Sequence, residues 1–427
     1  MDRFRIQGGT PLSGEVEVAG SKNAALPILA STLLLEGEAS LSRVPRLRDV
    51  ETMCGLLESL DCAIVSGSGL VQVRAHATGS TQAPYGIVRK MRASICVLGP
   101  LLARRGTAEA ALPGGCVLGA RPIDIHLRGL ESLGATLSLD SGVVRAKASR
   151  GGLQGGVANL QGPRGSTVLG TANILMAATL ARGDSTLKGC AREPEIKALA
   201  EFLNACGARI EGHGSSEINI QGVDRLHGVP WTIPSDRIEA GTLLLAGAAT
   251  GGKVRVTRMA PAELRALFEV MEIAGAPVQT GPDWAEVDAE TGRKRATSVT
   301  TGPWPDFPTD LQAQWTAFAA VCEGRSEIKD SVYPERFLHV AELRRMGADA
   351  GWESGKAWVE GPSTLQGAPV IASDLRASAA LVIGGLAATG ETLVKRIYHL
   401  DRGYESLETK LATLGGRVVR EPDPESP

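Results

Sequence analysis

Hydrophobic residues along the chain form two helical patterns, and each pattern is repeated six times. In the first, an amphipathic stretch such as "LESLG" (130–134) ends at a glycine and runs into alternating residues typical of a strand. Glycine suits that place because it enters the left-handed conformation that ends many helices. The polar face predicts that these helices lie on the outside. The turn residues follow one another at intervals of 68 to 73 residues: Asp61, Gly134, Gly207, Gly275, Gly347 and Gly415.

The second pattern lies about half a period away and is apolar nearly all round, as in "VLGPLLARRG" (97–106). A helix without a polar face is expected to be buried. Each copy again ends at a glycine, and the intervals are 66 to 77 residues: Gly37, Gly106, Gly183, Gly251, Gly324 and Gly390. Since two independent series agree six times, we infer a genuine structural repeat.

Each repeat of about 70 residues contains a buried helix, an outer helix and several strands. A chain of 427 residues exceeds what one hydrophobic core usually supports. Six units therefore predict two pseudo-symmetric domains of three, with a cleft between them and a boundary near "GVPWTIPSDRIEAG" (228–241). The acidic, proline-rich end "EPDPESP" (421–427) is predicted to be disordered.

Composition excludes several classes of protein. The net charge of -2 and the lack of a basic run give no nucleic-acid footprint. The start "MDRFRIQGGTPL" lacks a signal-peptide pattern, and the apolar stretch 377–390 is too short to span a membrane. Seven cysteines without a CxxC pair, and six histidines without metal-ligand spacing, favour a cytoplasmic protein without a disulfide framework or a zinc site.

The starts of the six buried helices should occupy equivalent places. Helix N-termini bind anions, and cations gathered near several of them suggest a phosphate-bearing ligand in a shared cleft. For any one cation alone, a solvated surface charge is the simpler interpretation. The predicted N-caps are Ser21, Ser235, Thr309 and Ser373, and the charged residues nearby are Lys22, Arg92, Arg237, Asp310 and Arg376.

Two residues with reactive side chains have alternative interpretations. Asp310 could support its own helix as a first-turn acid, which its position alone favours, or it could be a general base facing the cations. Cys116 follows Pro113, Gly114 and Gly115 in "LPGGCVLGARPID", where Arg121 would favour its thiolate. The other six cysteines are predicted to be buried and inert. The chain has no Walker loop, no GxGxxG after a strand, no HExxH and no GxSxG.

Several long motifs give the chain a family resemblance. They occur in order over nearly the whole length: "GSKNAALPIL", "MRASI", "LPGGCVLGARPIDIHL", "AREPEI", "PSDRIEAGT", "FPTDLQAQ", "SDLRASA" and "HLDRGYE". With these the chain resembles the UDP-N-acetylglucosamine enolpyruvyl (1-carboxyvinyl) transferases, which are EPSP synthase-like. The resemblance implies an α/β (α+β) fold of two pseudo-symmetric domains. Each has three βαβαββ-type repeats in an inside-out α/β barrel, and the active site lies in the interdomain cleft. The implied domains are 22–234, with the Cys116 loop, and 1–21 plus 235–427.

The family moves the enolpyruvyl group of phosphoenolpyruvate to the 3′-hydroxyl of UDP-N-acetylglucosamine (UDP-GlcNAc), the committed step of peptidoglycan precursor synthesis. The reaction proceeds by addition and elimination without metal or organic cofactor. By resemblance, Asp310 is the base, which reverses the preference from its position. Cys116 is the proton donor, can form a covalent adduct with phosphoenolpyruvate, and is the target of fosfomycin.

The substrate-binding residues are also implied by the resemblance alone. Those for phosphoenolpyruvate are Lys22, Asn23, Arg121 and Arg402. Those for UDP-GlcNAc are Arg92, Arg121, Pro122, Ile123, Asp124, Ile125, Asp310 and Val332. The family implies no nucleic-acid or membrane partner.

One stretch departs from the family. Many members carry a "KVSVGAT"-type segment at the uridine diphosphate, whereas this chain has "PRGSTVLGTAN" (163–173), so no contact is assigned there. The departure leaves open an enolpyruvyl transferase with another acceptor, such as a nucleotide. The shikimate-pathway relative is disfavoured by the cysteine loop and by "ARPIDIH". A silent sugar-nucleotide-binding paralogue is disfavoured because Cys116, Asp310, Lys22 and Arg402 are all retained.

Overall fold

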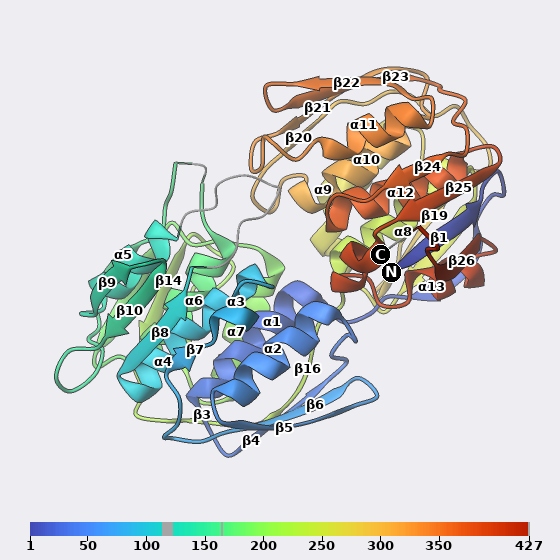
Figure 1. Cartoon of the computed structure of the whole chain (residues 1–427). Helices are drawn as coiled ribbons and strands as arrows, with labels where there is room; N and C mark the ends of the chain where they lie inside the picture. Colours follow the sequence, from blue (N-terminus) through green and yellow to red (C-terminus); the bar gives the residue numbers. More distant parts are fainter. Residues whose placement is uncertain (113–122, 164, 426–427) are drawn as a thin grey trace. The chain divides into compact units, whose positions relative to one another are not determined.

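The computed structural model describes residues 1–112, 123–163 and 165–425 (Figure 1). Two compact units divide the chain. One contains Met1–Ala19 and the described residues from Ser235 onward, and the other contains the described residues between Gly20 and Pro234. The units thus divide before Gly20 and before Ser235, whereas the family resemblance implies divisions before residues 22 and 235.

The described residues form six four-stranded sheets with one shared plan, three in each unit. An edge strand runs parallel to its neighbour, and the remaining two strands are antiparallel. In the 20–234 unit the sheets are β16 (Pro230–Thr232), β4 (Glu38–Ser42), β6 (Leu70–Ala75), β5 (Cys62–Gly67); β7 (Gln82–Ala83), β8 (Thr107–Ala111), β10 (Val143–Lys147), β9 (Thr136–Asp140); and β11 (Val157–Asn159), β12 (Asp184–Lys188), β14 (Glu217–Gln221), β13 (Arg209–Glu211). A short pair, β3 (Leu35–Glu36) and β15 (Leu226–His227), adds to this unit.

The other unit repeats the plan with strands from both ends of the chain. Its sheets are β2 (Ser13–Glu17), β17 (Lys253–Thr257), β19 (Trp284–Asp288), β18 (Val278–Thr280); β20 (Val299–Thr301), β21 (Gly324–Asp330), β23 (Lys356–Gly361), β22 (Asp349–Glu353); and β24 (Pro369–Ile371), β25 (Glu391–Lys395), β1 (Asp2–Gln7), β26 (Arg417–Pro422). β2 pairs in parallel with β17, and β1 lies between β25 and β26. The first 17 residues therefore complete two sheets of the later unit.

The apolar helices form the interior of each unit, as their sequence predicts, and Figure 1 shows the sheets around them. In the longest, every residue from Arg237 to Ala249 is buried. Within each unit these helices pack against one another. They are α1 (Lys22–Ser31), α4 (Leu98–Arg105), α6 (Val168–Ala178), α8 (Arg237–Thr250), α10 (Gln312–Ala319) and α12 (Leu375–Ala387).

The amphipathic helices bury one face and end at the predicted turns. All six turn residues have positive φ, from 61° at Asp61 to 106° at Gly207. The glycines that end the other series also have positive φ, from 70° to 101°. The repeat predicted from the sequence is therefore confirmed. The amphipathic helices are α2 (Arg48–Ser59), α5 (Asp124–Ser132), α7 (Pro194–Ala205), α9 (Arg265–Ile273), α11 (Leu338–Arg345) and α13 (Leu407–Thr413), and a further short helix is α3 (Tyr85–Val88).

Two glycines of the 20–234 unit allow the turn to be tested. A Cβ at Gly207 or at Gly55 would meet no atom within 4 Å, so backbone conformation alone decides the effect. Gly207→Ala places a side chain at φ 106° and is expected to lower the free energy of unfolding by about 1–2 kcal/mol. Gly55→Ala lies inside α2 and is expected to raise it by about 0.5–1 kcal/mol. Urea denaturation checks both, and equal effects of the two variants would contradict this account of the turns.

The C-terminal tail is more ordered than the sequence suggested. Glu421 and Pro422 belong to β26 and pair with Arg3 and Asp2, so the prediction of disorder from 421 is wrong for these residues. Glu421 also bonds to the guanidinium of Arg3 at 2.8 Å. Pairing with the first strand supplies hydrogen bonds that a local composition argument does not include.

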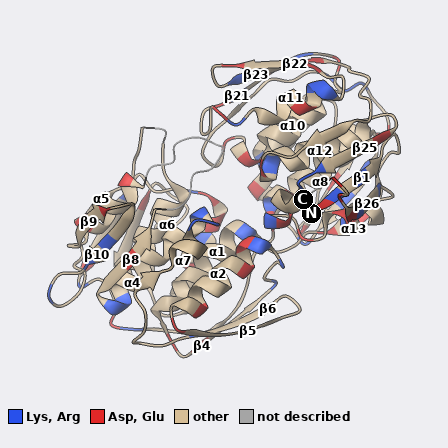
Figure 2. Ribbon diagram, viewed as in Figure 1, with Lys and Arg blue, Asp and Glu red and all other residues tan. Residues whose placement is uncertain are grey.

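Charges of both signs are interspersed over each unit (Figure 2). Among the described helices, none is both long and apolar enough to cross a membrane. In the same part of the chain, His, Cys, Asp and Glu side chains form no group suited to a metal ion.

Candidate active site

The buried helices begin at caps that the sequence predicts only in part. Ser21 caps α1, where its Oγ accepts from the N–H of Ala24 at 3.3 Å, as predicted. Ser235 and Ser373 are each wrong by one residue. The following aspartates, Asp236 and Asp374, accept two backbone N–H bonds each. A carboxylate is the stronger acceptor there and also complements the helix dipole.

Thr309 is the fourth predicted cap, and this prediction is wrong. It begins a 3₁₀ turn, Thr309–Leu311, that precedes α10 and has no side-chain cap. Its hydroxyl instead donates to Oδ2 of Asp330 at 2.7 Å. The turn directs the next residue, Asp310, toward side chains of other elements.

Asp310 forms ion pairs with two arginines. Its Oδ1 lies 2.9 Å from Nη1 of Arg336, and its Oδ2 lies 3.0 Å from Nη2 of Arg376. The carboxylate side chain is 26% exposed, whereas the two arginine side chains are 6% and 3% exposed. Burial raises the pKa of Asp310, but the two guanidinium groups lower it more, to well below its ordinary value. The residue therefore presents an ionised carboxylate that solvent or a ligand can reach.

This ion-pair cluster makes the stability depend on pH in acid. Because the pKa of Asp310 is lower in the folded than in the unfolded protein, the charged form stabilises the fold. That contribution is complete above the unfolded pKa of about 3.9 and is lost as the pH falls through the folded pKa. The stability difference between the wild type and Asp310→Asn should be constant from neutral pH to about pH 5 and shrink below about pH 4. Urea denaturation across this range checks the prediction, and a difference that grows on acidification would contradict it.

A buried hydrogen-bond network holds Arg376 in place. Its Nη1 donates to the hydroxyl of Tyr404 at 3.1 Å, and Nε2 of Gln314 lies 3.1 Å from the same oxygen. The hydroxyl of Thr242 donates to the carbonyl of Ile238, so Tyr404 donates to Thr242 at 2.9 Å. The orientation of Arg376 is thus fixed by groups of three other elements.

Asp330 joins two segments of the candidate site. Its buried carboxylate accepts from the hydroxyls of Thr301 and Thr309 and from the N–H groups of Val332 and Tyr333, at 2.7 to 3.0 Å. Thr309 in turn accepts from Nη1 of Arg336 at 3.2 Å. One side chain therefore orders both the segment with Asp310 and the segment with Val332.

The remaining candidate site residues of the unit that contains Ser235 and the described residues after it lie near helix starts and turns. Arg237 is the first residue of α8 and is 8% exposed. Arg402 ends the 3₁₀ segment Ile397–Arg402, two residues before Tyr404. The sequence singled out Asp310 and Arg376 but not the side chains that bond to them. Arg336, Asp330 and Tyr404 are scattered along the chain, and no sequence pattern links them to Asp310.

In the 20–234 unit, Lys22 begins α1 together with Asn23. Its Nζ lies 3.3 Å from Oδ2 of Asp49 on α2, and both side chains are largely buried, at 12% and 7% exposed. A cation at a helix N-terminus opposes the dipole, and the carboxylate of Asp49 offsets that cost.

The other site residues of this unit lie on two neighbouring segments. Arg92 begins the 3₁₀ segment Arg92–Val97, which continues into α4. Ile123 is buried just before α5, Asp124 is exposed and lies 3.6 Å from Arg128, and Ile125 is half-buried. Cys116, Arg121 and Pro122 lie outside the described residues.

The other cysteines have environments that suppress reactivity. Cys62, Cys96, Cys190, Cys206 and Cys322 are buried, as predicted, whereas Cys54 is only half-buried. Burial raises the pKa of the thiols of Cys54 and Cys62 to about 11 and of the other four to about 12. These six thiols therefore stay protonated at neutral pH.

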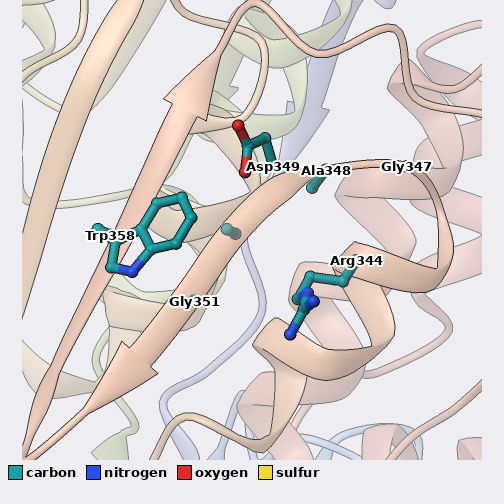
Figure 3. A pocket seen from close by; sticks show the side chains of 7 residues that line it. Arg344, Gly347, Ala348, Asp349, Gly351 and Trp358 are labelled. Atoms are coloured by element: carbon teal, nitrogen blue, oxygen red, sulfur yellow. The ribbon is translucent and has the colours of Figure 1, made fainter.

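A pocket of about 450 Å³ lies between α11, β22 and β23 (Figure 3). Its lining includes Arg344, Asp349 and Trp358 and contains none of the predicted site residues. A Cβ on Gly351 would come within 2.8 Å of the Trp358 ring, so the glycine allows the indole to lie flat on the strand.

Solved structures share this fold over essentially the whole chain. The enolpyruvyl transferase NikO from Streptomyces tendae matches with a TM-score of 0.88 and 24% identity, covering 99% of each chain. EPSP synthase from Acinetobacter baumannii matches with a TM-score of 0.74 and 17% identity, covering 99% of this chain and all of that one. The fold is therefore that of the enolpyruvyl transferases, and the predicted fold class is confirmed.

Sequence comparison gives the family. The family model for EPSP synthase (3-phosphoshikimate 1-carboxyvinyltransferase) matches residues 6–411. A UDP-N-acetylglucosamine 1-carboxyvinyltransferase from Cellvibrio japonicus is 50% identical over 421 residues, which cover 98% of this chain and 99% of the relative. The chain belongs to the EPSP synthase family.

Proposed function

We propose that this chain transfers the enolpyruvyl group of phosphoenolpyruvate to the 3′-hydroxyl of UDP-GlcNAc and releases phosphate. The observation that carries the proposal is 50% identity, over 98% of the chain, to a UDP-N-acetylglucosamine 1-carboxyvinyltransferase. The enzyme would thereby commit UDP-GlcNAc to peptidoglycan precursors. Both substrates are cytoplasmic metabolites, and we place the reaction in the cytoplasm.

The reaction needs a proton donor, a base and fixed cations. In the addition step, the methylene carbon of phosphoenolpyruvate takes a proton, and the 3′-oxygen bonds to its C2 as the hydroxyl proton leaves. In the elimination step, a proton leaves the new methyl group and the C2–phosphate bond breaks, which restores the double bond. No electrons are exchanged with a cofactor, and none is proposed.

Asp310 is proposed as the base that takes the hydroxyl proton. Its depressed pKa makes it a weak base in the free enzyme, but it is ionised and partly exposed, so it can accept a hydrogen bond from the hydroxyl. The hydroxyl becomes far more acidic as its oxygen bonds to C2, and the proton transfer is favourable from that point. The ion pairs with Arg336 and Arg376 keep the carboxylate ionised until that step.

The cationic residues are proposed to bind the charged groups of the substrates. Lys22, Asn23, Arg121 and Arg402 would hold the carboxylate and phosphate of phosphoenolpyruvate. UDP-GlcNAc would be bound by Arg92, Arg121, Pro122, Ile123, Asp124, Ile125, Asp310 and Val332. The 3.3 Å pair with Asp49 supports the role of Lys22, because it orients an ammonium at a helix N-terminus.

Cys116 is proposed as the donor of the proton to the methylene carbon. The raised pKa values of the other six thiols, five of them buried and Cys54 half-buried, support this choice. Cys116→Asp is expected to keep turnover and to resist fosfomycin, because a carboxylic acid donates a proton but is not readily alkylated by an epoxide. Residual activity after fosfomycin treatment checks this, and equally fast inactivation of the variant and the wild type would contradict it.

The acceptor is tested by phosphate release from phosphoenolpyruvate in the presence of UDP-GlcNAc, UMP or shikimate 3-phosphate. Release with UDP-GlcNAc alone is expected. The departure at 163–173 favours a second candidate, an enolpyruvyl transferase with another nucleotide acceptor, and release with UMP alone would support it. No release with any acceptor would point to a silent paralogue that binds sugar nucleotides.

A further inference from the structure

The segment 163–173, where the chain departs from the family, ends in a buried residue with an unusual set of contacts. Asn173 lies in the middle of α6 and is 0% exposed. Its Oδ1 accepts from the N–H of Gly99 at 2.7 Å, and its Nδ2 donates to the carbonyl of Ile95 at 3.2 Å. The same Nδ2 lies 3.1 Å from Nδ1 of His126.

The two backbone groups that Asn173 binds are four residues apart in one helical segment. In a continuous α-helix, the N–H of Gly99 would bond to the carbonyl of Ile95. Here the carboxamide of Asn173 bridges that pair, and the N–H of Leu98 also donates to Ile95 in the 3₁₀ manner. A side chain inserted at such a place fixes a change of helix geometry. The helix geometry changes at this point, because Arg92–Val97 forms a 3₁₀ helix and the α-helix begins at Leu98.

That change of geometry determines where Arg92 lies. A 3₁₀ helix turns about 20° more and rises about 0.5 Å more per residue than an α-helix. Over the six residues of Arg92–Val97 the difference reaches about 120° of rotation and about 3 Å of rise. If the segment returned to α geometry, Arg92 would point in another direction.

His126 links the same point to α5. Because both Nδ2 protons of Asn173 serve as donors, Nδ1 of His126 is the acceptor and the ring proton lies on Nε2. The ring stays neutral, since burial, with a smaller effect of Arg92, lowers the pKa of His126 to about 3. His126 directly follows Ile125, and Ile95 lies in the 3₁₀ segment that Arg92 begins, so Asn173 bonds to close chain neighbours of both groups of described residues assigned to UDP-GlcNAc in this unit.

Close packing leaves the bridge little freedom. A Cβ on Gly99 would come within 2.5 Å of Oδ1 of Asn173, and one on Gly129 within 2.5 Å of Ile174. Glycines on α4 and α5 thus let both helices approach α6 at adjacent residues. The carboxamide is held between them in one orientation.

We infer that Asn173 is a positioning residue for the sugar-nucleotide substrate, because it bridges the change from 3₁₀ to α geometry at the end of Arg92–Val97 and ties it to His126, the residue after the segment Ile123–Ile125. The inference rests on the proposed function. It assigns to the departing segment a role in shaping the binding site from within the core.

Asn173→Ala tests the inference against a matched control, Asn204→Ala. Asn204 lies in the same unit, on α7. Its Oδ1 accepts from the backbone N–H of Ile210 and its Nδ2 donates to the carbonyl of Ile210, both at 2.9 Å. Both variants should lower the melting temperature. Only Asn173→Ala is expected to weaken the binding of UDP-GlcNAc. Its Kd, measured by calorimetry, should rise by about tenfold or more, because small misplacements at a site have large effects. The KM for phosphoenolpyruvate at saturating UDP-GlcNAc should change less than this Kd, because Lys22 and Asn23, two of its four proposed ligands, lie on α1.

The outcomes separate the inference from the proposed function. A wild-type protein that does not bind UDP-GlcNAc would overturn the function itself. Normal binding by the wild type together with unchanged affinity in Asn173→Ala, or an equal loss in Asn204→Ala, would overturn the inference alone. Gly99→Ala, whose Cβ would come within 2.3 Å of the backbone carbonyl oxygen and 2.5 Å of Oδ1 of Asn173, displaces α4 from α6 and is expected to weaken binding in the same way. If neither Asn173→Ala nor Gly99→Ala folds, the contact serves the fold rather than the site, and the inference is wrong.

Discussion

Asp310→Asn is expected to lower kcat by about 10²–10⁴-fold, the range that a positioned general base contributes. The substitution keeps the shape of the side chain but removes the charge and the ability to take the hydroxyl proton. It also leaves the guanidinium groups of Arg336 and Arg376 facing a neutral amide. Steady-state kinetics with both substrates measures the effect, and calorimetry with UDP-GlcNAc shows whether the variant still binds its acceptor.

Asp349→Asn is the matched control for this prediction. Asp349 is an exposed aspartate of the same unit, on β22 at the pocket of Figure 3, and no role in the reaction is proposed for it. Its kcat should stay within about twofold of the wild type, as is usual for surface changes away from a site. A normal kcat in Asp310→Asn would remove Asp310 as the base.

Arg376→Met is expected to lower the free energy of unfolding by about 3 kcal/mol or more, as removal of one partner of a buried ion pair typically does. The side chain is 3% exposed and bonds to Asp310 and to the hydroxyl of Tyr404. Methionine fills much of the space but donates no hydrogen bond, so a carboxylate and a phenol each lose a partner. Urea denaturation of the ligand-free protein measures the change.

Arg265→Ala is the control for the arginine variant. Arg265 is 83% exposed and pairs with Glu269 at 2.9 Å on the surface of α9. Such a pair contributes little, and its loss should change the free energy of unfolding by no more than about 0.5 kcal/mol. Equal effects of the two substitutions would show that burial of the Asp310 cluster does not matter for stability.

The repeat could be predicted from the sequence because it depends on local properties. Apolar helices without a polar face are buried, and a turn such as that at Gly207 requires positive φ, which favours glycine. Periodicity could not show that β1 and β2 complete sheets of the later unit. Those pairs join residues such as Phe4 and Val394, and no local pattern encodes a partner so distant in the chain.

The sequence singles out candidate residues that stand in motifs but gives no sign of the side chains that bond to them from other parts of the chain. Asp310 and Arg376 lie at helix starts and carry chemistry that a sequence pattern can suggest. Arg336 and Asp330 became visible only through their bonds in three dimensions. The shift of the caps from Ser235 to Asp236 and from Ser373 to Asp374 has a local cause that sequence analysis could have weighed, namely the stronger acceptor next in the chain.

The Asn173 bridge illustrates a further limit. The residue is a single asparagine in an apolar helix, and a sequence gives no sign that its side chain bonds to Gly99 and Ile95 of another helix. Only the packing of α4, α5 and α6 brings these groups together.

The most direct test of the proposed reaction is mass spectrometry of UDP-GlcNAc after incubation with the purified protein and phosphoenolpyruvate. We expect the sugar nucleotide to gain one enolpyruvyl group, located on the 3′-oxygen by fragmentation or NMR, with one phosphate released per group transferred. An unchanged mass of UDP-GlcNAc under conditions in which the protein is folded would contradict the proposed function.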